Sequence, residues 1–287
     1  MGKLIVSSFY KYVRISRPSS VRRALQLFCD SLGIKGKVIV SREGINGSVS
    51  GTRKQVAECQ KHLLKDKLFS DLAFKRTSAS GHPYRKMFVR LRPEIVTFGR
   101  KVDMSKKGGY VTPKLLNRWI KNCEVVLVDA RNDYESKIGR FVNAVTPQIG
   151  TFSEFPKAVE QLAPFMGKKV VTYCTGGVRC EKASAFLKQS GFTNVFQLKG
   201  GILSYIKECP DSYFEGKCFV FDERISIPSG RKNSEVSACE LCHSPCSELA
   251  NCASVKCDKF FVCCSSCKAE TGGACSKKCR MSVVRKA

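Results

Sequence analysis

The chain has 287 residues, 43% of them hydrophobic, and is long enough for about two domains with cores of their own. Its 50 Lys and Arg residues against 24 Asp and Glu residues give a formal net charge of +26, which favours a polyanionic partner. No lipidation motif or basic amphipathic helix is evident, so we favour nucleic acid over a membrane surface, with a solvated basic surface as the alternative. No apolar run reaches the roughly 18 residues of a membrane span, and the N-terminal MGKLIVSSFYKYVRI lacks a signal-peptide cleavage site. We therefore expect a cytoplasmic protein that does not bind membranes.

Cysteine use points to the chemistry of thiols and metals. Of the 17 cysteines, seven are scattered before residue 220 and ten lie between Cys239 and Cys279. An odd number without a secretion signal argues against a disulfide framework and for a reducing compartment.

Residues 1–100 are predicted to form a small α+β domain. Apolar spacing predicts strands at residues 4–15, 35–51 (two halves around a Gly-rich turn), 71–79 and 87–99, and helices at residues 20–33 and 52–66. This order, β-α-β-β-α-β or close to it, is typical of a ferredoxin-like fold. Because that fold serves many functions, its side chains must indicate the role.

Two basic segments of this domain are candidate RNA contacts. In REGING, Arg42 and backbone amides can bind a phosphate; alternatively the segment is a tight hairpin in which Gly44 and Gly47 take positive φ. In YRKMFVRLRP, basic residues alternate with Tyr84 and Phe88, which offers charge and stacking to single-stranded RNA, although half of the alternation can instead be core. The basic residues of this second segment are Arg85, Lys86, Arg90 and Arg92.

After an expected linker at residues 102–114, the second domain, residues 113–216, alternates between the two kinds of element. The pattern predicts helices at residues 114–122, 153–165, 181–191 and 202–209, and strands at residues 124–131, 168–174 and 193–201. Such alternation predicts a parallel sheet wrapped by helices, with the site at the carboxyl ends of the strands. Cys174 occupies one of these ends.

The loop after that strand reads CTGGVR, from Cys174 through Thr175, Gly176, Gly177 and Val178 to Arg179. Its glycines allow amides to point at the loop centre, and the next helix begins there, so the loop is a predicted anion pocket. Such dipoles and an arginine lower a thiol pKa, which indicates a reactive cysteine; a buried structural cysteine is the alternative.

The sequence leaves the roles of two residues at the start of the next helix undecided. Cys180 is either a resolving thiol or a residue that packs, and we favour packing. Lys182 is expected to face RNA or solvent.

The last part, residues 217–287, combines an extended connector at residues 218–233 with a Cys-rich tail that has few large apolar residues. Paired thiolates two to four residues apart are typical of zinc sites, and two sites would use eight cysteines. Cys264 is favoured over Cys263 because it forms a C-x2-C pair with Cys267. A reduced, flexible tail that is dispensable for activity is the alternative. The candidate ligands are Cys239, Cys242, Cys252, Cys257, Cys264, Cys267, Cys275 and Cys279.

The loop YCTGGVRCEKAS, with VDARNDYESKIGRFVNA before it and LKGGILSY after it, resembles the rhodanese domain. The resemblance implies that Asp129 and Arg131 brace the fold and that Cys174 can carry a persulfide. Related phosphatases have a loop one residue longer, so phosphatase activity is not expected.

With SREGINGSVSG and with CFVFDER before the Cys-rich tail, nearly the whole chain resembles the bacterial rhodanese-like tRNA uridine hydroxylases. The resemblance implies an α/β protein with an N-terminal ferredoxin-like α+β domain, a central rhodanese-like parallel-sheet domain and a small zinc-binding tail. It also implies that molecular oxygen is the co-substrate, that the anticodon stem-loop of tRNA is the partner, and that the product is 5-hydroxyuridine at the wobble position. Cys174 is the implied catalytic residue.

The sequence has no flavin or nicotinamide motif, and its three histidines do not form an iron site. We therefore hypothesise that Cys174 adds to C6 of the uracil ring and makes C5 reactive toward oxygen. Two competing functions stay open: a sulfurtransferase that passes persulfide sulfur to a protein or tRNA, and a non-catalytic RNA-binding module. The electron source, the tRNA species and the oligomeric state are also open.

Overall fold

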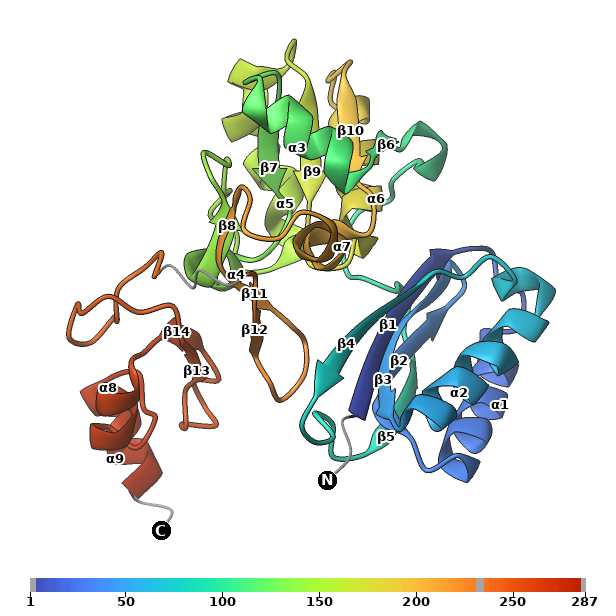
Figure 1. Cartoon of the computed structure of the whole chain (residues 1–287), viewed down its shortest axis with the longest axis horizontal. Coiled ribbons are helices and arrows are strands. Elements are labelled where there is room, and N and C mark those ends of the chain that lie inside the picture. The colour runs from blue at the N-terminus through green and yellow to red at the C-terminus, as the bar shows by residue number, and fades with distance from the viewer. Residues whose placement is uncertain (1–3, 231–234, 285–287) are drawn as a thin grey trace. The chain divides into compact units, whose positions relative to one another are not determined.

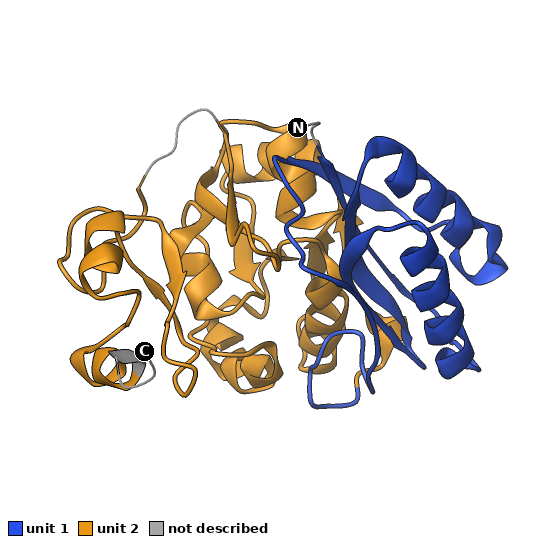
Figure 2. Cartoon of the chain, turned by 90° about the horizontal axis from the view of Figure 1, so that it is seen from below, with its two compact units in different colours: residues 1–101 blue, residues 102–287 orange. Residues whose placement is uncertain are grey.

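The computed structural model describes residues 4–230 and 235–284. Part of the expected connector, residues 231–234, and the last residues of the tail, 285–287, lie outside the described residues. The chain forms two compact units, Met1–Lys101 and Val102–Ala287, shown in different colours in Figure 2. The second unit contains both the parallel sheet and the Cys-rich tail.

Unit 1 is a five-stranded sheet with two helices on one face (Figure 1). Its elements are β1 (Leu4–Tyr12), α1 (Pro18–Ser31), β2 (Lys35–Ser41), β3 (Gly44–Gly51), α2 (Arg53–Lys65), η1 (Lys67–Phe69), β4 (Phe74–Ala79) and β5 (Met87–Leu91). The strand order is β4-β1-β3-β2-β5, in which β5 runs parallel to β2 and the other neighbours are antiparallel. The first four strands have the order of a ferredoxin-like fold, so this prediction is confirmed.

The last strand of unit 1 is shorter than expected and has two distinct faces. It ends at Leu91 instead of continuing to residue 99, and Pro93, which has no amide hydrogen, lies two residues further on. Met87 and Val89 enter the core with the helices, whereas Phe88 and Arg90 are exposed. Because strand side chains alternate, Phe88 and Arg90 lie on the face away from the helices.

The REGING segment is a tight hairpin, but only one of its two glycines has the expected positive φ. Gly44 has a φ of 147°, which agrees with the hairpin interpretation. The expectation for Gly47 is wrong, because it lies inside β3 without a positive φ. There a Cβ would come within 2.7 Å of Val38 Cγ2, so glycine is needed for close packing.

Unit 2 is built on a four-stranded parallel sheet of order β6-β10-β9-β7. The elements around it are η2 (Met104–Lys106), β6 (Gly109–Val111), α3 (Pro113–Lys121), β7 (Val126–Asp129), α4 (Asp133–Ile138), β8 (Gly139–Phe141), η3 (Phe152–Glu154), α5 (Phe155–Ala158), η4 (Val159–Phe165), β9 (Val170–Tyr173), α6 (Val178–Gln189), β10 (Val195–Leu198) and α7 (Gly201–Glu208). Val171 and Tyr173 of β9 pack with residues of α3 and α7. The predicted parallel sheet is confirmed, with β9 inside it.

Two local predictions for this unit are wrong. The expected linker contains β6, an edge strand, because Gly109 and its neighbours pair with β10. The helix expected at residues 153–165 is broken into η3, α5 and η4, because Pro156 and Pro164 interrupt the hydrogen-bond pattern of a continuous helix.

The remainder of unit 2 connects the sheet to the Cys-rich tail. Its elements are β11 (Phe214–Phe219), β12 (Ser226–Pro228), β13 (Leu249–Asn251), β14 (Phe260–Val262), α8 (Ser265–Glu270) and α9 (Lys277–Val284). Strands β12, β11 and β8 form one small sheet, and β13 and β14 form a hairpin. Tyr134 of α4 stacks on Phe260 of β14 at 4.9 Å between ring centroids and meets Phe219 edge-on. The tail is therefore packed onto α4 and β11. Within the described ranges, no helix is long and apolar enough to cross a membrane.

Candidate functional site

Cys174 lies at the carboxyl end of β9, where the chain turns into α6. The Gly177 amide donates a hydrogen bond to Cys174 Sγ at 3.1 Å, and the Arg179 amide also donates to this sulfur. Gly177 precedes the helix with a φ of 101°, a conformation that favours glycine. The loop therefore directs two amides and the start of a helix at one buried sulfur.

The start of α7 holds the other side of this loop. The Ile202 amide donates to the Cys174 carbonyl at 2.9 Å, and the Leu203 amide donates to the Thr175 carbonyl at 3.1 Å. Gly201 makes this contact possible, because a Cβ on it would lie 2.5 Å from the Cys174 oxygen. Gly176 differs: no atom lies within 4 Å of where its Cβ would be, so open space adjoins the loop at this point.

The environment favours a thiolate on Cys174. Burial alone raises its pKa, but the hydrogen bond with Cys180, the charge of Arg179 and the two loop amides lower it from 9.0 to about 5. The Cys180 pKa is raised, chiefly by burial and by its hydrogen bond with Cys174. The pair therefore holds one thiolate and one thiol at neutral pH, which is the state needed for nucleophilic attack.

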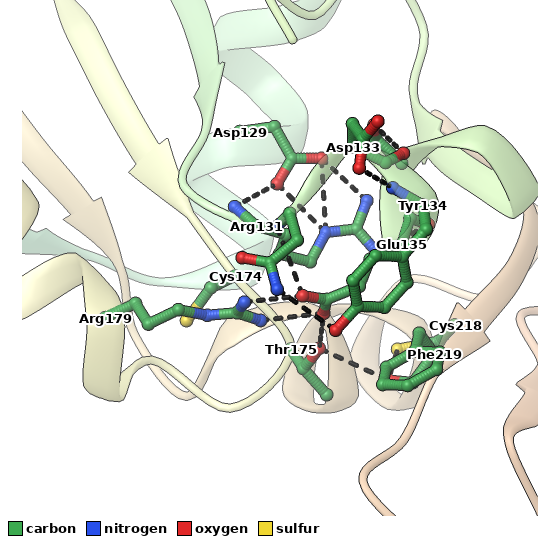
Figure 3. A network of polar contacts seen from close by, with 12 residues as sticks. Asp129, Arg131, Asp133, Tyr134, Glu135, Cys174, Thr175, Arg179, Cys218 and Phe219 are labelled. Atoms are coloured by element: carbon green, nitrogen blue, oxygen red, sulfur yellow. Dashed lines mark hydrogen bonds and ion pairs between the residues drawn. The ribbon is translucent and has the colours of Figure 1, made fainter. Parts of the chain in front are cut away.

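Arg179 is held by Glu135, a residue that the sequence did not single out. Its guanidinium donates to both Glu135 carboxylate oxygens, at 2.5 and 2.8 Å, and both side chains are buried (Figure 3). Glu135 also accepts hydrogen bonds from the Asn132 amide and the Thr175 hydroxyl. The Asn132–Glu135 capping box was readable in the sequence, but a pairing across 44 residues was not.

Asp129 and Arg131 form a second buried ion pair close by (Figure 3). The Arg131 side chain donates to both Asp129 oxygens and to the Gly139 carbonyl. It thereby connects the end of β7 with the start of β8. Arg131 is not in contact with the sulfur through any of these bonds, which suits a bracing role.

An exposed aromatic ring lies over the arginine. The Arg179 guanidinium is 5.3 Å from the centroid of the Phe221 ring, and Phe221 is 59% exposed. The Phe219 ring meets the Phe221 ring edge-on, with 5.0 Å between the ring centroids. The Phe219 carbonyl accepts a hydrogen bond from the Thr175 hydroxyl. Phe221 had no role in the sequence interpretation, because only the fold brings β11 next to the loop.

Cys180 and Lys182, the two residues after the loop whose roles were open, are both buried. Cys180 is fully buried and contacts Cys174 through its thiol, so it both packs and lies within reach of the reactive sulfur. The expectation for Lys182 is wrong: it is 4% exposed and faces neither solvent nor an open RNA surface.

Unit 1 presents the other predicted RNA contacts as exposed side chains. Arg90 lies 5.2 Å from the centroid of the exposed Phe88 ring, so charge and an aromatic face occur together on β5. Arg42 is exposed in the turn between β2 and β3. Arg85, Lys86 and Arg92 are exposed at the two ends of β5.

The tail gathers the eight candidate cysteines into two clusters of four, within each of which all sulfurs lie within 4.8 Å of one another. The first cysteine cluster contains Cys239, Cys242, Cys264 and Cys267; the second cysteine cluster contains Cys252, Cys257, Cys275 and Cys279. The clusters interleave along the chain, because one pair of the second cluster lies between the two pairs of the first. Cys263 is outside both, with its thiol directed at the Cys264 carbonyl.

The clusters fit tetrahedral zinc. A zinc–sulfur bond of about 2.3 Å places tetrahedral sulfurs about 3.8 Å apart. Cys242 and Cys264 have sulfurs 3.7 Å apart, and so do Cys257 and Cys275.

Models of known protein families match successive parts of the chain. Family models match at three stretches: a UPF0176 acylphosphatase like domain at residues 4–95, a Rhodanese-like domain at residues 112–208 and a Rhodanase C-terminal model at residues 215–280. Among solved structures, a rhodanese-related protein from Thermoplasma volcanium is 25% identical, covers 35% of this chain and 93% of its own, and has a TM-score of 0.30.

Curated relatives match over nearly the full length. The tRNA uridine(34) hydroxylase of Cytophaga hutchinsonii is 39% identical over 275 residues, which is 95% of this chain and 88% of that protein. The protein of the same name from Sinorhizobium medicae is 43% identical over 249 residues, 85% of this chain and 79% of that protein. The chain, with its rhodanese-like loop and its two flanking parts, thus belongs to the tRNA uridine(34) hydroxylase family.

Proposed function

We propose that this protein hydroxylates C5 of the wobble uridine of tRNA with molecular oxygen, and that Cys174 is its nucleophile. The observation that carries the proposal is the buried Cys174 sulfur, which accepts a hydrogen bond from the Gly177 amide. Its pKa is lowered by Cys180, by the charge of Arg179 and by the loop amides. The relatives named for this reaction, at 39% and 43% identity, support the substrate.

The proposed chemistry uses the polarity of the uracil ring. The C5–C6 double bond is conjugated with the C4 carbonyl, so a thiolate adds at C6 and the electron pair moves to C5 and the carbonyl oxygen. C5 then carries the electron density that oxygen accepts. The Gly177 amide orients the sulfur before attack, and Glu135 keeps the Arg179 charge in place.

Unit 1 is the proposed docking surface for the anticodon stem-loop. Proteins read single-stranded RNA by stacking unpaired bases on aromatic rings and pairing the backbone with Arg and Lys. Phe88 and Arg90 offer this combination on β5, with Arg42, Arg85, Lys86 and Arg92 as further exposed charges.

We further propose that each cysteine cluster holds one structural zinc ion. The support is the set of four thiol donors in each cluster and their sulfur spacing of 3.7 Å. Zinc would fix the fold of the tail, and no step of the reaction involves it. Reduced thiols at these positions favour the cytoplasm as the compartment.

The proposal is tested by mass spectrometry of nucleosides from tRNA incubated with the purified protein in air. We expect a gain of one oxygen on uridine and none with Cys174→Ala. Equal hydroxylation by Cys174→Ala would contradict the role of the thiol.

The same experiment addresses the second candidate, sulfur transfer from a Cys174 persulfide. A buried thiolate facing amides and Arg179 suits a sulfane sulfur equally well. Exchange of sulfur for oxygen on uridine would identify this activity instead.

A further inference from the structure

The proposed hydroxylation needs a source of two electrons. One atom of molecular oxygen enters uridine, and the other must be reduced to water. A second thiol can supply two electrons together with Cys174, because a dithiol becomes a disulfide by losing two electrons.

The geometry points to Cys180 as the reductant: in each turnover it reduces the oxygen bound at C5 and then forms a disulfide with Cys174. This inference rests on the proposed function and deepens it. Cys180 becomes a catalytic residue that contacts the reacting atoms.

Three contacts fix Cys180 beside the reactive sulfur. It lies in the first turn of α6, where its amide donates to the Gly177 carbonyl at 3.1 Å. The Gly177 amide in turn donates to Cys174 Sγ at 3.1 Å, and a hydrogen bond between the two buried thiols contributes to the pKa of each. Cys218, another buried thiol of this unit, instead directs its Sγ at the Phe219 carbonyl, 3.6 Å away. Cys180 is thus the thiol whose contacts reach the Cys174 sulfur.

Position also suits the chemistry. C5 is one bond from C6, the atom to which Cys174 adds. In the proposed adduct, a thiol hydrogen-bonded to Cys174 Sγ is therefore separated from an oxygen bound at C5 by the sulfur, C6 and C5 alone.

The first half of the reaction forms a hydroperoxide. The Cys174 thiolate bonds to C6, and the electron pair of the C5–C6 double bond moves to C5. C5 bonds to molecular oxygen, and the terminal oxygen takes a proton.

The second half consumes the dithiol. The Cys180 sulfur attacks the terminal oxygen, the O–O bond breaks, and the thiol proton passes to the oxygen on C5; this leaves C5–OH and a sulfenic acid on Cys180. Loss of the C5 proton and of Cys174 from C6 restores the double bond and releases 5-hydroxyuridine. The Cys174 thiolate then attacks the sulfenic sulfur, and hydroxide leaves as water after taking a proton. In sum, uridine, oxygen and two thiols give 5-hydroxyuridine, water and one disulfide.

The test is a single turnover without added thiol. The fully reduced protein is freed of reductant and mixed with tRNA in air. Mass spectrometry then counts 5-hydroxyuridine per chain and, after alkylation and digestion, the peptides joined through Cys174 and Cys180. We expect at most one product per chain, matched by one Cys174–Cys180 disulfide, and further product only after a dithiol reductant is added.

Two variants separate electron supply from hydrogen bonding. Cys180→Ser keeps a hydrogen-bond donor but cannot form a disulfide, so its product per chain should fall about tenfold or more while alkylation of Cys174 keeps its pH profile. Cys218→Ser removes a nearby buried thiol and should leave product and disulfide unchanged.

The profile of Cys180→Ser also shows that the loop is intact. Wild-type product yield from Cys180→Ser, product without the disulfide, or several products per chain without reductant would each overturn the inference while leaving the proposed function standing. Absence of both product and disulfide in the wild type would overturn both.

Discussion

At Cys174, burial and hydrogen bonding act on the thiol in opposite directions. Burial disfavours the charge, and the contacts with Cys180, Arg179 and the loop amides outweigh it. The thiolate is therefore the form present above a pKa near 5, and protonation removes it only below that value.

A pH profile of alkylation checks this balance. The rate of Cys174 alkylation by iodoacetamide, followed by peptide mass spectrometry, should reach half of its high-pH plateau near pH 5. Cys180→Ala removes a lowering contact and should move this midpoint upward. A wild-type midpoint at about 8.5, the value of a free cysteine, would contradict the thiolate.

Glu135 is expected to matter more for stability than an exposed acid does. Glu135→Gln leaves the buried Arg179 charge without its partner, which should lower the free energy of unfolding by about 3–5 kcal/mol. Urea denaturation measures this loss. Glu124→Gln is the matched control, because Glu124 forms an exposed pair with Lys169 and should change stability little. Equal losses in both variants would contradict the role given to Glu135.

Residues of one continuous motif could be predicted from sequence, and partners distant in the chain could not. CTGGVR by itself predicted an anion pocket around Cys174, since all its parts are local. Glu135 and Phe221 reach Arg179 only after α4 and β11 pack beside the loop. Burial of Lys182 was missed for the same reason: a lysine in a helix gives no sign of which face is covered.

At the scale of elements, the approach of α7 to the thiol loop depends on one glycine. Gly201→Ala would place a methyl group 2.5 Å from the Cys174 carbonyl at a φ of +67°, so we expect a loss of about 1–3 kcal/mol and a higher Cys174 pKa. Thermal unfolding and the alkylation profile measure both.

Gly176→Ala is the control for this prediction. It adds the same methyl group within the loop, where no atom lies within 4 Å, and should leave stability unchanged. If the two alanine variants behaved alike, contact between α7 and the loop would not be what requires Gly201.

Interleaving couples the two cysteine clusters. The purified chain should contain two zinc ions, and Cys267→Ser should release both. The reason is that Cys252 and Cys257 of the second cluster lie, along the chain, between the two cysteine pairs of the first cluster. Activity should fall as well, since β14 stacks on Tyr134 next to Glu135. Metal analysis and the hydroxylation assay measure these effects.

Cys246→Ser is the matched control, since Cys246 is buried in the tail but belongs to neither cluster. It should keep both ions. A Cys267→Ser protein with one zinc ion and full activity would contradict the coupling and favour a dispensable tail.

Regular elements were predictable where apolar periodicity and end signals agreed. The helix α2 has a capping box at Thr52 and Gln55 and begins where its sequence predicts. The apolar pattern of residues 153–165 predicted one helix, although the prolines within this range break it in the structure. The strand β6 was missed because three residues are too few to show alternation. Pairing of the cysteines also required the fold, because spacing allows several groupings of ten thiols.

At the scale of the whole molecule, composition and motif order carried the most information. The charge of +26 indicated a nucleic-acid partner before any element was assigned. The order of a ferredoxin-like sheet, a parallel sheet and a Cys-rich tail is found in the structure, with the last two in one compact unit. The reaction itself could not follow from charge or topology, because the same loop suits both sulfur transfer and hydroxylation.

We expect oxygen gas to supply the atom that is added to C5 of uridine in a reaction that requires Cys174. The most direct test is turnover under isotopically heavy oxygen gas in ordinary water, followed by nucleoside mass spectrometry of the tRNA. We predict heavy 5-hydroxyuridine with the wild type and none with Cys174→Ala. A hydroxyl group that carries the isotope of water, or a heavy product made without Cys174, would contradict it.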